Sequence, residues 1–180
     1  MQDTISIAEL ESRMQPNAWS IGGFLGSSES LESVIHEDAQ TLDRLGVSYD
    51  ILASTLQDLL SKASKGGGRG HLQFSARSPE NLPRFSLNNL PIQNAGFTQD
   101  AVQVFITGFM GKQDCPWECE NPELSSIDFL CLNRLTGEWM VGPGMIVHLI
   151  RNHHFFEGHG SPYRVDPEKL IRILRLELVK

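Results

Sequence analysis

Cysteine is scarce in this sequence of 180 residues, which contains only Cys115, Cys119 and Cys131. An odd and sparse set of this kind excludes the disulfide framework that stabilises many small secreted proteins. The sequence also lacks an apolar run of the roughly 20 residues that are needed to cross a bilayer. Its first residues do not show the basic start and apolar centre of a secretion signal. We therefore expect a soluble, cytoplasmic protein that has no membrane partner.

Basic residues are rare in the first third of the sequence. Residues 1–61 contain ten acidic side chains but only Arg13 and Arg44 as bases, and the whole chain has a net charge of −7. Residues 45–48 separate two expected helices and resemble the turn of helix-turn-helix DNA-binding proteins. Residues 49–58 would form the reading helix, yet they offer a phosphate backbone two acids and no base. A nucleic-acid-associated regulator that uses this hairpin is therefore kept only as a second alternative.

Helical periodicity dominates the N-terminal region, residues 1–61. Apolar residues recur at helical spacing over 30–45, and Ser48 is well placed to cap a second helix, so the two should form a helical hairpin. Residues 62–100 are rich in glycine and proline and predict a linker followed by an irregular segment. Within that segment only 72–76 has the character of a short strand.

From residue 101 onward the pattern changes to alternating apolar residues and turn signals. In chain order it predicts three strands (102–107, 127–132 and 138–141) and two helices (145–154 and 166–177). The fold class is therefore α+β: an N-terminal helical hairpin, then a small antiparallel β unit with C-terminal helices around a Cys/His loop. We predict that 101–180 form a zinc-binding domain.

The sharpest chemical feature is a pair of cysteines followed by a pair of histidines. Cys115 and Cys119 enclose the segment Pro-Trp-Glu, and His148 and His153 follow the predicted β-hairpin. Thiolate and neutral imidazole are ligands that zinc prefers, and four of them close a tetrahedral structural site. The spacing fits the general pattern of such sites, although the central gap is longer than that of a classical zinc finger. We predict that these four residues bind one structural Zn²⁺ ion.

The second histidine ligand is less well defined by the sequence. His153 follows His148 by five positions, which is a rotation of roughly 140° on an ideal helix. The two side chains converge only if the helix tightens or ends near Asn152. His154 and His159 are therefore alternatives for the fourth ligand. Without a metal, the cysteines would be buried thiols and His153 a hydrogen-bonded core histidine.

Two catalytic interpretations remain beside the structural one. Residues 148–159 hold four histidines and Glu157, and Glu157 would be the general base of a metal-dependent hydrolase. Residues 115–119 resemble the Cys-Pro-Trp-Cys motif of glutaredoxins with one residue inserted. In glutaredoxins the motif begins a helix, which lowers the pKa of a thiol. Residues 120–123 are a poor continuation of a helix, which weakens this resemblance.

The sequence shows no convincing pair of nucleophile and base. We therefore expect a zinc-stabilised interaction or regulatory protein rather than an enzyme, with another protein as its partner. Cys131 alternates with the apolar residues of a predicted strand, so we expect it in the core. The sequence does not determine the oligomeric state.

Overall fold

The structure, a computed structural model, describes residues 5–66, 72–76 and 78–176. Within these ranges it contains five α-helices, a short 3-10 turn and one antiparallel sheet of four strands, so the predicted α+β class is confirmed. The elements in chain order are α1 (Ile7–Met14), α2 (Leu31–Leu45), α3 (Tyr49–Lys65), η1 (Pro79–Asn81), β1 (Phe97–Gln99), β2 (Val102–Gly108), β3 (Ile127–Asn133), β4 (Trp139–Pro143), α4 (Ile146–His153) and α5 (Pro167–Leu174).

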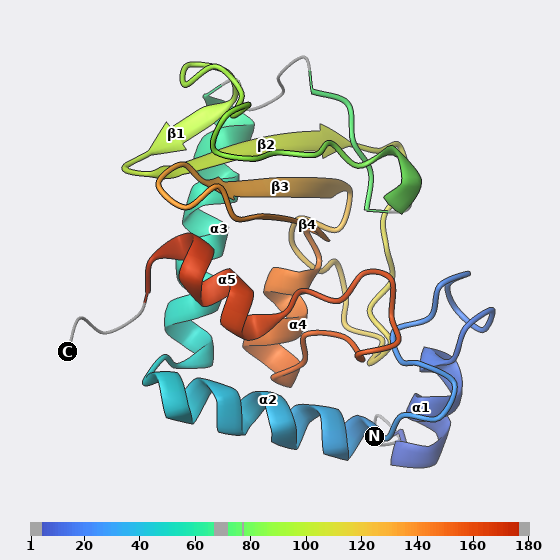
Figure 1. Cartoon of the computed structure of the whole chain (residues 1–180). Helices are drawn as coiled ribbons and strands as arrows, with labels where there is room; N and C mark the ends of the chain where they lie inside the picture. The colour runs from blue at the N-terminus through green and yellow to red at the C-terminus, as the bar shows by residue number, and fades with distance from the viewer. Residues whose placement is uncertain (1–4, 67–71, 77, 177–180) are drawn as a thin grey trace.

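Local sequence signals define α2, α3 and the short turn between them. Gly46 ends α2 with a φ of 68°, a left-handed conformation that glycine adopts without strain. The Ser48 hydroxyl then accepts a hydrogen bond of 3.2 Å from the backbone N–H of Ile51, which caps α3. Figure 1 shows that α3 reaches the sheet, whereas α2 lies across the opposite end of the molecule. The two expected helices and their short turn are therefore present, but the helices do not lie side by side: α2 packs on α5, and α3 packs on α4 and the sheet.

The strands follow one another in the sheet in the order β1-β2-β3-β4, and every neighbouring pair is antiparallel. The register places Cys131 of β3 between Val104 of β2 and Met140 of β4. Cys131 is fully buried, as expected from its alternation with apolar residues. Strand β1 was not expected, because its three residues follow a segment rich in proline and asparagine and show too short an alternation to detect.

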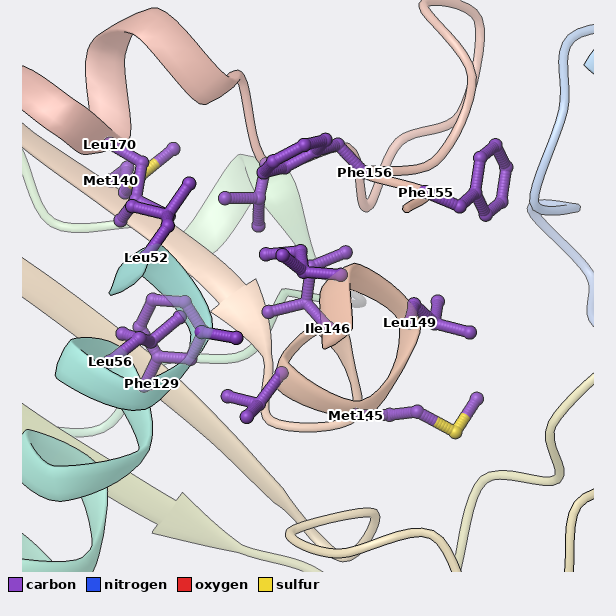
Figure 2. Packing of buried hydrophobic residues seen from close by; sticks show 14 of the residues in the cluster. Leu52, Leu56, Phe129, Met140, Met145, Ile146, Leu149, Phe155, Phe156 and Leu170 are labelled. Carbon is purple, nitrogen blue, oxygen red and sulfur yellow. The ribbon is translucent and has the colours of Figure 1, made fainter. Parts of the chain in front are cut away.

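The two faces of the sheet have different coverings. One face packs against α3 and α5, and Figure 2 shows Phe129 of β3 near Leu52 and Leu56 of α3; Ile146 of α4 belongs to the same hydrophobic cluster. The other face contributes Phe105, Leu130 and Leu132 to a second hydrophobic cluster. That cluster is completed by residues from the segment before β1: Leu72, Phe74, Leu82, Phe85, Leu90 and Ala95.

The irregular segment therefore has a packing function, but it does not contain the strand expected at 72–76. Residues 72–75 have no regular structure and Ala76 lies in a turn. The backbone N–H of Ala76 donates 2.8 Å to the carboxylate of Asp128 on β3 instead of to a neighbouring strand. This side-chain acceptor replaces the ladder bond that a strand would need.

Two helix ends also differ from the expected ones. Helix α3 continues to Lys65, four residues into the expected linker, because Ala63 is buried and Lys62 pairs with Asp58 at 2.6 Å. Residues 67–70 of that linker lie outside the described residues. Helix α5 ends at Leu174 because Arg175 turns into the left-handed conformation. One hydrophobic cluster includes residues from both 1–61 and 101–180, while the division of the chain at 62–100 stays a prediction.

Among the helices of the described residues, none is long and apolar enough to cross a membrane.

The packing of α3 predicts how the core responds to substitution. Leu56 is fully buried, whereas Ile51 on the same helix is 52% exposed. We expect Leu56→Ala to lower the free energy of unfolding by about 2–5 kcal/mol, since it leaves a cavity between α3, α4 and the sheet. The matched control Ile51→Ala should cost less than about 1 kcal/mol. Urea unfolding followed by circular dichroism measures both, and equal losses would contradict the assigned core.

Candidate metal centre

The fold brings together two cysteines from a loop and two histidines from a helix. The ligand atoms of Cys115, Cys119, His148 and His153 all lie within 4.8 Å of one another. These four residues, called the Cys/His cluster below, are the group predicted from the sequence. They lie close enough to one another to hold a metal ion.

A tight turn after β2 presents the two sulfur atoms. The backbone N–H of Glu118 donates 2.8 Å to the carbonyl oxygen of Cys115, and Glu118 itself has a φ of 57°. This turn directs the backbone N–H groups of Trp117 and Cys119 toward the Cys115 sulfur, which accepts hydrogen bonds from both. Such bonds stabilise a thiolate, which is the form that binds a metal.

Helix α4 presents the two imidazoles. Its apolar side is anchored in the core by Ile146, Val147, Leu149 and Ile150, which are all buried. The helix ends at His153, because His154 adopts a left-handed conformation with a φ of 54°. The sequence required an end near Asn152 for the two histidines to converge. The left-handed residue directly after His153 supplies that end.

Two sulfur–nitrogen distances match a shared ion. The Nε2 atom of His153 lies 3.5 Å from the Cys115 sulfur and 3.3 Å from the Cys119 sulfur. Ordinary zinc–sulfur and zinc–nitrogen bond lengths at a tetrahedral angle place two such ligands about 3.6 Å apart. The observed spacing lies within hydrogen-bond range and also allows these three atoms to share one metal ion.

His148 has a buried nitrogen that lacks a partner. Its Nε2 atom is buried and finds no hydrogen bond among the described residues. Its Nδ1 atom lies 2.8 Å from the amide nitrogen of Asn152, one helical turn later. The nitrogen and oxygen of an amide exchange places by a half-turn of the side chain, and with the oxygen in this position Nδ1 would carry the proton and donate. Nε2 would then be unprotonated and able to coordinate a metal. A metal at the cluster would satisfy this otherwise unpaired atom.

The protonation states of the cluster are set mainly by burial. Burial lowers the pKa of His153 to about 4, helped by the neighbouring His148 and His154, and it also lowers the pKa of His148. Both imidazoles are therefore neutral near pH 7, as metal binding requires. Burial raises the pKa of Cys115 to about 12, although its two backbone hydrogen bonds act in the opposite direction. A bound cation would supply the positive charge that a buried Cys115 thiolate needs.

Two neighbouring side chains position the histidines, and neither role was expected from the sequence. Trp117 stacks on the His153 ring with centroids 3.9 Å apart and planes 5° apart, and it meets Phe155 edge-on at 5.7 Å. Asn152 contacts His148 as described. The four-residue spacing of His148 and Asn152 could have indicated their contact, whereas nothing local indicates the stacking of Trp117.

The other histidine candidates lie elsewhere. His154 is exposed and stacks on Tyr49 with centroids 4.1 Å apart. His159 is also exposed, and its Nε2 atom lies 3.1 Å from the Glu37 carboxylate. Neither belongs to the Cys/His cluster, so the structure places His153 there and not the two alternatives.

Glu157 belongs to a separate buried network. Its carboxyl group lies 2.6 Å from the Ser161 hydroxyl, which is also 3.0 Å from the Gly23 carbonyl oxygen. The carbonyl can only accept, and a hydroxyl has one proton, so both contacts are satisfied when Glu157 is protonated and donates to Ser161. Arg164 binds the Glu157 carbonyl oxygen and pairs with Asp38 at 2.5 Å. Burial raises the pKa of Glu157 to about 8. A buried, protonated carboxyl group outside the cluster is a poor general base for a metal-bound water.

The glutaredoxin resemblance does not extend to the structure. No helix begins at Cys115, since residues 115–126 form turns and irregular backbone before β3. The pKa of Cys115 is raised by burial, whereas a helix start would lower it.

Fold and cluster together define an α+β protein with a Cys₂His₂ group that is close enough to hold a metal ion. The chain matches no protein-family model, no curated protein and no solved structure at a significant level. The geometry of the cluster is therefore the main guide to function.

The protonated state of Glu157 predicts a pH dependence of stability. Its pKa is about 8 in the folded protein and near its ordinary 4.5 in the unfolded chain. The folded state therefore keeps a proton that the unfolded state loses, so this contribution to stability is fully present below about pH 4.5 and is lost as the pH rises toward 8. We expect a decline of up to about 1.4 kcal/mol per pH unit across this window.

Glu157→Gln should remove that decline, since the amide keeps the shape without a titrating proton. The two cluster histidines have lowered pKa values, so they make the folded state more stable as the pH rises and act in the opposite direction. The difference between variant and parent isolates Glu157 from them. Urea unfolding between about pH 5 and about pH 8 measures this difference. Parallel pH profiles would show that Glu157 is ionised in the folded protein.

Proposed function

We propose that the Cys/His cluster binds one Zn²⁺ ion as a structural metal, and that the protein is a zinc-stabilised interaction or regulatory protein. The observation that supports this most directly is the spacing of the donors, with two sulfur–nitrogen distances of 3.5 and 3.3 Å at His153. The unpaired, buried Nε2 atom of His148 adds a fourth donor.

A structural role is favoured over a catalytic one by the number of donors. Four protein ligands fill a tetrahedral shell, whereas a hydrolytic zinc keeps one position for water. Glu157, the candidate base of the hydrolase alternative, bonds to Ser161 and stays outside the cluster. The metal-dependent hydrolase is therefore the weaker proposal.

Zinc is the ion that best suits this donor set. Two thiolates and two imidazoles exclude hard cations such as Mg²⁺ and Ca²⁺, which take oxygen ligands. Thiolate ligands also require a compartment that keeps cysteines reduced, and the three cysteines of the structure are unpaired. The cytoplasm remains the location that we propose on this ground.

The ion would join parts of the chain that are distant in sequence. Cys115 and His153 are 38 positions apart, with β3, β4 and most of α4 between them. Binding energy at such a site is also folding energy, since the unfolded chain does not hold the four donors together. The expected role of the metal is to fix the loop after β2 against α4.

Metal binding predicts a pattern of stability losses. Purified protein should contain about one zinc per chain. In a solution with free zinc at about a thousand times the Kd, bound metal should add about 4 kcal/mol to the free energy of unfolding, and a chelator should remove this contribution. Cys115→Ser and His148→Ala should each remove the chelator effect. The double variant should lose little more than either single variant, because one ion is lost in all three cases.

His154→Asn is the matched control, since asparagine tolerates the left-handed backbone at this position and His154 is outside the cluster. It should keep both the metal and the chelator effect. Elemental analysis and thermal melts with and without chelator measure these quantities. Protein that contains no metal after refolding with zinc, or ligand variants whose losses simply add, would refute the proposed site.

A further inference from the structure

Two hollows lie side by side next to the Cys/His cluster. The first has a volume of about 580 Å³ and is bordered by the N-terminal loop around Trp19 and Ile21, with Asp128 of β3 among its walls. The second, of about 410 Å³, opens onto Cys115 and its neighbours in the turn. Trp19 and Asp114 border both hollows, so the two adjoin at these residues and are together called the Trp19 groove below.

Carboxylates surround this groove. Asp114, Glu118 and Glu120 are exposed residues on its walls, whereas the carboxylate of the buried Asp128 accepts the backbone N–H of Ala76. Lys112 is the one basic side chain among the described residues that line the two hollows. Clefts lined by charges of one sign concentrate ligands of the opposite sign, so the field here favours a cationic group.

Apolar surface accompanies these charges. Trp19 is 43% exposed and Ile21 86% exposed on the rim, and Phe24 and Tyr163 line the first hollow. Long cationic side chains place their apolar stems against such surfaces and keep the charged head near carboxylates. Tryptophan is also the aromatic ring that attracts a cation most strongly.

The chain itself shows how this surface holds a cationic side chain. The guanidinium group of Arg13 lies over the Trp19 ring, 5.1 Å from the ring centroid. The same guanidinium pairs with the Glu118 carboxylate at 2.6 Å. Arginine between a tryptophan ring and a carboxylate of the cysteine turn is therefore an arrangement that already exists on this edge of the groove.

We propose that the Trp19 groove binds an extended, basic segment of a partner protein. An arginine or lysine side chain of that segment would enter the first hollow beside Trp19 and Asp114, and a neighbouring apolar residue would cover Ile21. An extended segment fits better than a small free amine, because a second hollow with acidic walls adjoins the first at Trp19 and Asp114. Extended peptides gain affinity by filling consecutive pockets in this way.

This inference rests on the proposed function. Cys115 and Cys119 line the second hollow, so an ion bound to their sulfur atoms would fix one wall of the groove. Removal of the metal should therefore weaken peptide binding, while the first hollow keeps its support from β3 and from the N-terminal loop.

Selection from a phage-displayed library of random peptides of about twelve residues tests the proposal on the zinc-loaded full-length protein. Selected sequences should contain arginine or lysine next to an apolar residue. Fluorescence anisotropy of the best labelled peptide should show at least about tenfold weaker binding to Ile21→Ser and to Asp114→Asn, with a further loss at high salt. The control Asp43→Asn/Asp50→Asn removes two exposed acids near the α2–α3 turn and should change the Kd less than about twofold.

The outcomes separate the two proposals, because zinc content is measured on the same preparations. Zinc-loaded protein that selects no peptide, or selects peptides without basic residues, refutes the groove proposal and leaves the metal site intact. Equal losses in the groove variants and in the control show non-specific attraction to an acidic protein and also refute it. Basic peptides that bind metal-free protein as tightly as zinc-loaded protein refute the dependence on the ion. A small free amine that binds the protein more tightly than the selected peptide would reassign the first hollow to a small ligand and overturn the peptide proposal.

Discussion

Helix α4 is fixed from two sides, and the rest of the candidate centre depends on this constraint. Its apolar side, with Ile146 and Leu149 fully buried, packs into the core beside α3 (Figure 2). Its other side turns His148 and His153 toward the cysteine turn. A close-packed core does not allow such a helix to rotate or slide without a loss of packing energy. The two imidazoles are therefore held in place by hydrophobic packing, whether or not an ion is bound.

The N-terminal residues couple this centre to the groove beside it. Arg13 of α1 pairs with Glu118 in the cysteine turn, and the backbone N–H of Phe24 donates 2.8 Å to the Met14 carbonyl oxygen. The loop that bears Trp19 is thus closed on itself and attached to the turn that bears the sulfur atoms. A change in that turn would reach the groove through these contacts, which gives a physical route from the proposed metal site to the proposed peptide site.

The regular elements with strong local signals could be predicted, and the irregular ones could not. The caps at Ser48 and Asp166 each accept the hydrogen bond that their residue types favour, from Ile51 and Lys169. The alternating residue pattern of β2 and β3 was long enough to predict both strands from the sequence. The strand predicted at 72–76 is absent, because an apolar loop that covers a sheet has the same kind of amino-acid composition as a strand. Only the bond from Ala76 to Asp128 distinguishes the two.

The sequence by itself determined the chemistry of the donors, since two thiols and several imidazoles at these spacings favour a soft metal whatever the fold. Tertiary structure decided which histidines take part. It ended α4 at His153 and stacked Trp117 on that ring, while His154 turned away to Tyr49. It also buried Glu157, which the sequence presented as a candidate base, beside Ser161. Burial and stacking arise from residues far apart in the chain, so they cannot be predicted from local sequence spacing.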